Sequence, residues 1–299
     1  MPTCLVTGGS GFTGRHLIAL LKQRGHRVVA TASQPCGADV TAALDLGDRE
    51  ALAALVQRER PERVFHLAAL SFVGHPRPLD FYRVNVLGTE TLLEVLDELD
   101  SPPRVLLSSS ANVYGANARE VIDEAVVPAP VNHYAASKLA MEHMARNHAE
   151  RLPMLIARPF NYTGPGQAEQ FLIPKIVAHF RRRDASIELG NLDVSRDFSD
   201  VRDLVTAYAD LLEQWPVQAA SGDVVNLCGG EATPLRQLIE ELQALAGYEI
   251  EVRVNPAFVR KSEIPRLCGD PARLHRWWRG RPSYTLADTL RDMLHHDQG

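Results

Sequence analysis

The sequence has few cysteines, and their spacing excludes two common uses of that residue. Its 299 residues contain four, Cys4, Cys36, Cys228 and Cys268, and none of them forms a Cys-x-x-Cys pair. Zinc sites and disulfide frameworks both need cysteines that recur at short, regular spacings. We therefore expect four free thiols and no metal site.

Long apolar runs and an excess of positive charge are also absent. No stretch approaches the roughly 18 consecutive apolar residues of a membrane span, and the start of the chain carries no basic leader or apolar signal core. The net charge of -5 disfavours binding to a nucleic-acid backbone. With 45% hydrophobic and 23% charged residues, the composition is that of an ordinary globular protein. We expect a cytoplasmic protein with no membrane or nucleic-acid partner.

A glycine-rich turn stands where a first strand meets a first helix. An apolar run at residues 3–7 leads into Gly8-Gly-Ser-Gly11-Phe12-Thr13-Gly14, and residues 15–22 have helical spacing. In a dinucleotide-binding turn the first glycine permits the tight turn, the second lets the backbone approach a pyrophosphate, and the third lets the helix pack closely. We expect the cofactor diphosphate to lie on the free amides of this helix, with Phe12 and Thr13 beside it.

Strands and helices alternate through residues 1–160. Apolar runs at 27–32, 63–69, 104–110 and 153–159 predict four further strands, and a long helical pattern runs from Pro78 to Leu99. Such alternation is typical of an α/β protein with a Rossmann-type, doubly wound parallel sheet. Its ligands lie at the carboxyl ends of the strands.

Two of these segments contain further candidate contacts with a cofactor. The strand at 63–69 ends in Leu67-Ala68-Ala69, where small residues leave room for a ligand. His66 in that strand is expected to pack within the sheet, since no second metal ligand is suitably spaced. Asp45 and Leu46 stand where a third segment would cover the adenine, although an Asp at that point can instead cap a helix.

The second predicted strand lacks the acidic residue that often binds the ribose hydroxyls of a dinucleotide. Residues 31–34 contain no carboxylate, which permits a 2′-phosphate at this point. Ser33 could bond such a phosphate, but no Arg or Lys stands between Arg27 and Arg49. We therefore expect NADPH as the cofactor, with NADH as an alternative.

After residue 160 the alternation changes. Residues 161–167 are rich in turn formers, and they are followed by helical patterns at 169–183, 201–214 and 235–246 and by a strand at 223–227. In this order the chain can return to the sheet and leave it again. We predict a Rossmann domain of residues 1–160 and 197–228, and a smaller, interleaved C-terminal substrate lobe of residues 161–196 and 229–299.

A tyrosine and a lysine stand one helical turn apart in the sequence. Tyr134-Ala-Ala-Ser-Lys138 opens a helical run, which places the two side chains on one face with Cβ atoms roughly 5–6 Å apart. A nearby ammonium lowers the pKa of a phenol from about 10, so that the phenol can exchange a proton with a reacting oxygen. Ser110, at the end of the fourth strand, would add a hydrogen bond to that oxygen. The alternative is a surface helix that carries both residues by chance.

These motifs resemble the extended short-chain dehydrogenases/reductases that modify nucleotide sugars. The resemblance covers essentially the whole chain and includes the strings at residues 66–69, 157–167 and 193–203. Within the family, the chain is most similar to the reductases that convert GDP-4-keto-6-deoxy-D-mannose to GDP-D-rhamnose.

The resemblance implies a catalytic group of Ser110, Tyr134 and Lys138. It also implies a homodimer, formed through the helices that begin near Pro78 and Tyr134. The residues that it implies for binding a GDP-linked sugar are Ser110, Asn112, Asn161, Arg196, Arg260 and Glu263.

The residues after Ser110 help to choose among reactions. Related dehydratases place an acid there, because the loss of water needs further proton transfer, whereas this chain has Ala111 and Asn112. A nucleotide-sugar 4-epimerase with tightly bound NAD remains an alternative, because residues 108–115 are similar to its version of the motif. A cofactor-sensing binding protein is a third. The missing acid after the second strand and the strings in the substrate lobe favour the reductase.

Overall fold

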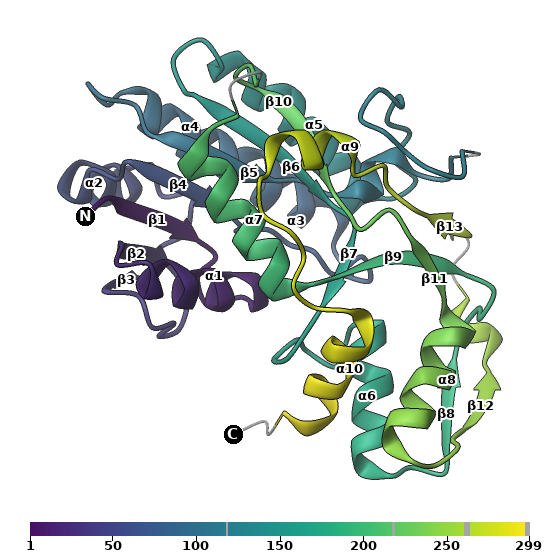
Figure 1. The fold of residues 1–299 in the computed structure, drawn as a ribbon. Helices are drawn as coiled ribbons and strands as arrows, with labels where there is room; N and C mark the ends of the chain where they lie inside the picture. Colours follow the sequence, from purple (N-terminus) through teal and green to yellow (C-terminus); the bar gives the residue numbers. More distant parts are fainter. Residues whose placement is uncertain (118, 217–218, 260–263, 297–299) are drawn as a thin grey trace.

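A seven-stranded parallel sheet forms the centre of the computed structural model, which describes residues 1–117, 119–216, 219–259 and 264–296 (Figure 1). The strand order is β10-β6-β5-β4-β1-β2-β3. The strands are β1 (Thr3–Thr7), β2 (Arg27–Thr31), β3 (Val40–Ala42), β4 (Arg63–His66), β5 (Arg104–Ser108), β6 (Met154–Pro159) and β10 (Asp223–Leu227). The order reverses beside β1, so a ligand crevice is expected at the carboxyl ends of β1 and β4. The predicted Rossmann-type α/β fold is confirmed.

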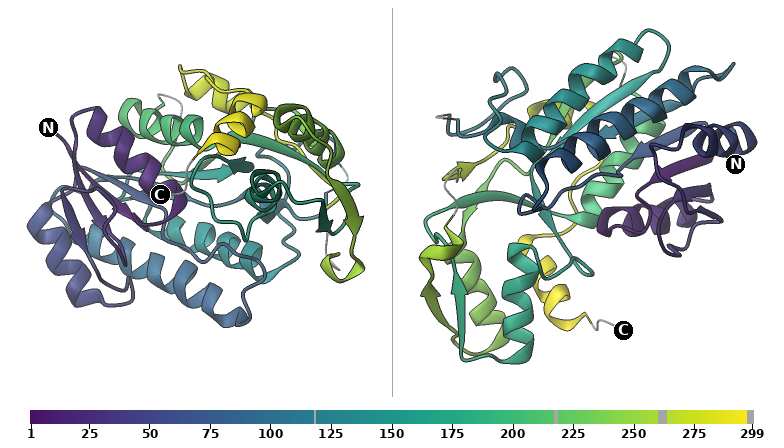
Figure 2. Two further views of the ribbon diagram at one scale, coloured as in Figure 1. Left: turned by 90° about the horizontal axis from the view of Figure 1, so that it is seen from below. Right: turned by 180° about the vertical axis from the view of Figure 1, so that it is seen from behind.

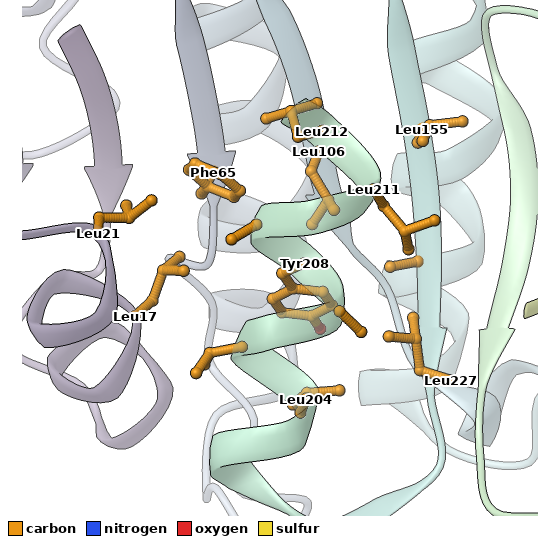
Figure 3. Close-up of a cluster of buried hydrophobic side chains, with 14 of the residues drawn as sticks. Leu17, Leu21, Phe65, Leu106, Leu155, Leu204, Tyr208, Leu211, Leu212 and Leu227 are labelled. Atoms are coloured by element: carbon orange, nitrogen blue, oxygen red, sulfur yellow. The ribbon is translucent and has the colours of Figure 1, made fainter. Parts of the chain in front are cut away.

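Helices cover both faces of this sheet, as the predicted doubly wound arrangement requires. One face packs against α1 (Phe12–Gln23), α7 (Val201–Gln214) and α9 (Ala272–Trp277). The other packs against α2 (Arg49–Glu59), α4 (Gly88–Asp97) and α5 (His133–Ala145). In Figure 3, α7 with Leu204 and Tyr208 lies in front of the strands, and Leu17 of α1 lies to its left.

The helix predicted from Pro78 to Leu99 forms as three consecutive pieces. It begins as α3 (Pro78–Tyr82), continues through a π-helical turn, Arg83–Leu87, and ends as α4. Asn85 lies in the π turn with its side chain buried, and its amide hydrogen-bonds the main chain of Leu70 in both directions. Because π turns inside helices often mark functional sites, this departure from the predicted α-helix directs attention to the loop after β4.

The second lobe lies beside the carboxyl end of the sheet (Figures 1 and 2). Its larger sheet contains β7 (Asn161–Thr163), β9 (Ser195–Asp200), β11 (Ala232–Pro234) and β13 (Arg266–Leu267), and its smaller sheet pairs β8 (Ser186–Leu189) with β12 (Glu251–Val254). The helices α6 (Leu172–Arg182), α8 (Leu235–Ala246) and α10 (Leu286–His295) enclose a separate apolar core. Three short 3-10 turns complete the described elements: Ala111–Tyr114, Arg146–His148 and Pro256–Phe258.

The chain passes between the two parts more than once. After β9, α7 and β10 return to the central sheet, and β10 pairs with β6. Leu274, Trp277 and Trp278 also belong to the core of the central sheet, although they lie within residues 229–299. The predicted domain boundaries stay a prediction, with this one segment packed on the Rossmann side.

Candidate active site

Tyr134 and Ser110 meet at the carboxyl end of the sheet. Tyr134 stands in the first turn of α5, where the Asn132 side chain caps the helix by accepting a hydrogen bond from the amide of Ala135 (2.9 Å). Ser110 follows β5, and its hydroxyl lies close enough to the phenol of Tyr134 to lower the pKa of that phenol. Both side chains are buried, so a reacting oxygen placed between them would be largely shielded from water.

The protonation of Tyr134 differs from the expectation. The sequence predicts that Lys138 lowers the pKa of the phenol, yet burial raises the pKa of Tyr134 to about 12, against a smaller lowering by the bond from Ser110. The Lys138 Nζ instead donates to the main-chain carbonyl of Ser108, 2.7 Å away. With the protein's own groups around it, Tyr134 therefore holds its proton at neutral pH.

Lys138 is itself strongly affected by its surroundings. Its side chain is 2% exposed, and burial lowers the pKa of Lys138 to about 8, while the carboxylate of Glu142 raises it. The ammonium therefore titrates just above neutral pH, in the range where a buried lysine can affect a reaction.

The glycine turn has the shape that a dinucleotide diphosphate requires. Gly8 has φ +69°, and a Cβ atom there would lie 2.8 Å from the Cα of Ala68. A Cβ on Gly14 would lie 2.4 Å from the carbonyl oxygen of Gly8. Among the described residues no side chain caps α1 at Gly11, so the amides of its first turn are left for another acceptor, such as an anion. These residues fit a bound dinucleotide.

Leu67 and Ala68 are held against this turn by Thr7. The Thr7 hydroxyl accepts the amides of Leu67 (3.2 Å) and Ala68 (3.1 Å), which places the end of β4 beside β1. His66 contacts the hydroxyls of Thr7 (2.8 Å) and Thr89 (2.7 Å), and burial lowers its pKa to about 3. His66 is thus a neutral, hydrogen-bonded residue of the sheet, as expected.

The loop after β4 is fixed to the catalytic helix through Asn85. Its Oδ1 accepts the amide of Leu70 (2.9 Å), and its Nδ2 donates to the hydroxyl of Ser137 on α5 (3.0 Å). The same loop contains Ala69, which is partly exposed. The π turn that carries Asn85 therefore joins the expected cofactor edge to the helix of Tyr134 and Lys138.

Ser33, Asp45 and Leu46 lie at the edge of the sheet expected to hold the adenosine. Ser33 is exposed, 3.4 Å from the hydroxyl of Ser10 in the glycine turn. Asp45 bonds the amide of Gly47 (2.9 Å), and the cap of α2 is Asp48, so the alternative that Asp45 caps this helix is wrong. Leu46 is buried on the face of the sheet that packs against α2, α4 and α5.

Of the predicted substrate residues, Asn161 and Arg196 lie on neighbouring strands of the lobe, and Asn112 lies in the turn after Ser110. Asn161 of β7 pairs opposite Phe198 of β9, the strand that also carries Arg196. The Arg196 guanidinium donates to the carbonyls of Ser195 (2.9 Å) and Pro265 (3.3 Å). Asn112 donates to the Ser110 hydroxyl from its side chain (3.1 Å) and its main chain (3.2 Å). Arg260 and Glu263 lie outside the described residues.

Tyr162 is a site residue that sequence reasoning missed. It is stacked on Phe12 at 6.1 Å between ring centroids, and its hydroxyl hydrogen-bonds Thr13 (2.9 Å). Phe12 and Thr13, predicted to lie beside the cofactor, therefore also join the glycine turn to the strand of Asn161. The only signal in the sequence was that Tyr162 follows Asn161 directly.

Two further features bear on the class of site. Within the described ranges no group of three or more His, Cys, Asp or Glu side chains could hold a metal ion, and the four cysteines are free thiols. None of the described helices has the length and apolarity to cross a bilayer.

Two curated proteins illustrate what the chain is similar to. It is 36% identical over 271 residues to a GDP-6-deoxy-D-talose 4-dehydrogenase of Aggregatibacter actinomycetemcomitans, covering 90% of this chain and 89% of that protein. It is 37% identical over 300 residues to a GDP-6-deoxy-D-mannose reductase of Pseudomonas aeruginosa, covering 97% and 95%.

Two solved structures share the fold over nearly their whole length. A candidate epimerase of Burkholderia cenocepacia J2315 superposes with a TM-score of 0.90 at 45% identity, covering 98% of this chain and 97% of that one. RMD from Pseudomonas aeruginosa, solved with NADPH, superposes with a TM-score of 0.85 at 34% identity, covering 98% of each chain.

The family follows from a match over most of the sequence. Residues 4–228 match the NAD dependent epimerase/dehydratase family, and this range contains the glycine turn, Ser110, Tyr134 and Lys138. Together with the relatives named as reductase and dehydrogenase, the match supports an NAD(P)-dependent oxidoreductase. The chain belongs to the NAD dependent epimerase/dehydratase family of extended short-chain dehydrogenases/reductases.

Proposed function

We propose that the protein uses NADPH to reduce the C4 ketone of GDP-4-keto-6-deoxy-D-mannose, forming GDP-D-rhamnose. The observation that carries this proposal is the buried contact between Ser110 and Tyr134, in a chain 36% and 37% identical to two proteins named for GDP-linked 6-deoxy sugars. Reduction at C4 would give either rhamnose or its C4 epimer, 6-deoxy-talose, and the names of the two relatives contain both sugars. The face of C4 that meets the cofactor decides between them.

In this proposal Tyr134 is the general acid. Burial keeps the phenol protonated at neutral pH, so its hydroxyl can donate a hydrogen bond to the C4 oxygen and then transfer the proton as the ketone becomes an alcohol. Ser110 donates a second hydrogen bond to that oxygen as its negative charge develops. Lys138 keeps a positive charge beneath the site and binds the cofactor ribose. The bound reduced nicotinamide supplies the hydride to C4.

The residues next to Ser110 support reduction over dehydration. Ala111 is buried and Asn112 is bonded to the Ser110 hydroxyl, so neither position offers a carboxylate for removing the C5 proton of the sugar. The sugar diphosphate would be bound by Asn161 and Arg196, on neighbouring strands of the lobe, with Arg260 and Glu263 at the guanosine end.

NADPH is the cofactor we propose, with NADH as an alternative. Residues 31–34, at the end of β2, contain no carboxylate, and Ser33 with Ser10 offers hydroxyls at that point for a 2′-phosphate. The similarity to a structure solved with NADPH agrees with this choice. Titration of the protein with each reduced cofactor, followed by fluorescence, would measure the preference.

A second candidate is a nucleotide-sugar 4-epimerase that holds NAD permanently. The observation in its favour is the 45% identity to a candidate epimerase. An epimerase keeps its oxidised cofactor through purification and needs none added, whereas a reductase consumes one reduced cofactor in each turnover. The absorbance spectrum of the purified protein and its requirement for added NADPH therefore separate the two.

The deciding experiment offers GDP-, UDP-, CDP- and dTDP-linked 4-keto-6-deoxy sugars in parallel while the absorbance of the reduced cofactor is followed. We expect oxidation of NADPH with the GDP sugar, and proton NMR of the product identifies the configuration at C4. Oxidation with a different nucleotide alone would refute the assigned base. No oxidation with any keto sugar, together with interconversion of UDP-glucose and UDP-galactose, would establish the epimerase.

A further inference from the structure

A buried ion pair lies one helical turn beyond Lys138. Glu142 of α5 is fully buried, and its carboxylate is bound on both oxygens by Arg158 of β6, at 2.9 Å from Nε to Oε1 and 2.5 Å from Nη2 to Oε2. A bidentate pair of this kind is both strong and directional. The proposed reaction uses neither residue.

The carboxylate of Glu142 also holds the end of β5. The Ser109 hydroxyl donates to Oε1 of Glu142, and the neighbouring carbonyl of Ser108 accepts from Lys138. Two residues one turn apart on α5 thus fix Ser108, the last residue of β5, and Ser109, which joins the strand to Ser110. Because Ser109 precedes Ser110 in the chain, a displacement of Glu142 would also move the serine that lies beside Tyr134.

Arg158 is fixed on its other side as well. Its guanidinium lies 4.8 Å from the ring centroid of Tyr114, and the Tyr114 hydroxyl donates to Oδ1 of Asn226 (2.7 Å). The arginine therefore lies between an aromatic ring and a carboxylate, and it cannot turn away from Glu142 without losing both contacts.

The titratable and charged groups around Lys138 come from three elements. Tyr134 and Glu142 lie on its own helix, Arg158 lies behind Glu142 on β6, and His66 of β4 is kept neutral by burial and by the lysine itself. Glu142 is the charged neighbour that raises the pKa of Lys138, against the effect of burial. The carboxylate thus opposes the loss of the ammonium charge.

We infer that Glu142, held by Arg158 and Ser109, is a positioning residue that keeps the buried Lys138 in its charged form and fixes the strand end that presents Ser110. The inference rests on the proposed function only for the consequence that turnover needs the ammonium. The effect on Lys138 itself is independent of any substrate.

The test is a direct titration of Lys138 by NMR. The chain has four lysines, Lys22, Lys138, Lys175 and Lys261, so lysine labelled with ¹³C at Cε gives few signals, and a Lys138→Met variant assigns one of them. In the wild-type protein the midpoint should lie near pH 8. Glu142→Gln keeps the shape but removes the charge, and should lower this midpoint by about one pH unit or more. Ser109→Ala removes a hydrogen bond but no charge, and should leave it unchanged.

A second variant is needed in case Glu142→Gln does not fold, because that substitution leaves the charge of Arg158 buried beside a neutral group. The double variant Glu142→Gln, Arg158→Met removes both charges of the pair. Because Arg158 lies behind Glu142 as seen from Lys138, the midpoint should still fall, but by less than in Glu142→Gln alone, while Glu142→Asp should restore it. An unchanged midpoint in folded Glu142→Gln, or in the double variant if only that one folds, would overturn the inference. So would failure of both variants to fold, which would make Glu142 a residue of stability alone.

The same variants separate this inference from the proposed function. If Glu142→Gln loses reductase turnover at neutral pH and regains it as the pH is lowered, both stand. A shifted midpoint in a protein that reduces no keto sugar would leave the inference intact and refute the function. Normal turnover of keto sugar in Glu142→Gln with an unshifted midpoint would support the proposed function and refute the inference about Glu142.

Discussion

Gly8 is the position where the geometry of the cofactor turn can be tested most directly. Its φ of +69° costs an L-residue about 1–2 kcal/mol. An added Cβ would also lie 2.8 Å from both the Cα and the amide nitrogen of Ala68, which are main-chain atoms of the neighbouring strand end and cannot move aside cheaply. Such overpacking costs about 1–3 kcal/mol. Gly8→Ala should therefore lower the free energy of unfolding by about 2–5 kcal/mol.

Gly25 offers a matched control for the backbone part of this cost. Its φ is +79°, and no described heavy atom lies within 4 Å of the position of an added Cβ. Gly25→Ala should therefore carry only the conformational cost, partly offset by the lower entropy of its unfolded chain, and should lose about 1 kcal/mol.

Urea denaturation followed by tryptophan fluorescence measures both free energies, and fluorescence titration measures NADPH affinity. We expect Gly8→Ala to lose more stability than Gly25→Ala and to bind NADPH more weakly, because the strand end and the glycine turn must separate to admit the methyl group. If the two variants lose the same free energy of unfolding, the close approach of Gly8 to Ala68 adds no measurable cost, and the reasoning is refuted.

The remaining predictions concern the acid, the pH dependence and the assembly. Tyr134→Phe should lower turnover by roughly 10²–10⁴-fold with NADPH binding retained. Tyr248→Phe, in the lobe core, is the control and should leave turnover unchanged. Wild-type turnover in Tyr134→Phe would remove the phenol from the mechanism. Burial depresses the pKa of His66 to about 3, so the stability that neutral His66 contributes is present above its unfolded pKa of about 6.5 and is lost as the pH falls toward 3. In urea denaturation the free energy of unfolding should fall by about 2 kcal/mol between pH 6.5 and pH 5, and His66→Asn should lack this loss. We expect a homodimer through α3 to α5, where Leu79 and Leu87 are 79% and 62% exposed, and Leu87→Glu should yield a monomer in sedimentation; a monomeric wild-type protein would contradict this.

The sequence by itself determined the parts of this protein that depend on neighbours along the chain. The strand, glycine turn and helix of residues 3–23 could be predicted because backbone freedom at Gly8 and apolar periodicity are local properties. The one-turn relation of Tyr134 and Lys138 follows from helical spacing alone, and the parallel sheet follows from the alternation of elements. The strand β3 escaped prediction because three half-exposed residues carry too little pattern.

Properties that depend on burial and on distant segments could not be read from the sequence and became visible only in the folded chain. Burial raises the pKa of Tyr134, where the sequence predicted a lowering, and it also lowers the pKa of Lys138. Desolvation is the largest influence on both groups, and it depends on what the fold packs around them. The contact of Tyr162 with Thr13 and the pair of Glu142 with Arg158 join residues from different elements, and no local pattern encodes such neighbours. Periodicity places residues on a face, but the protonation of a catalytic group depends on what the fold packs against that face.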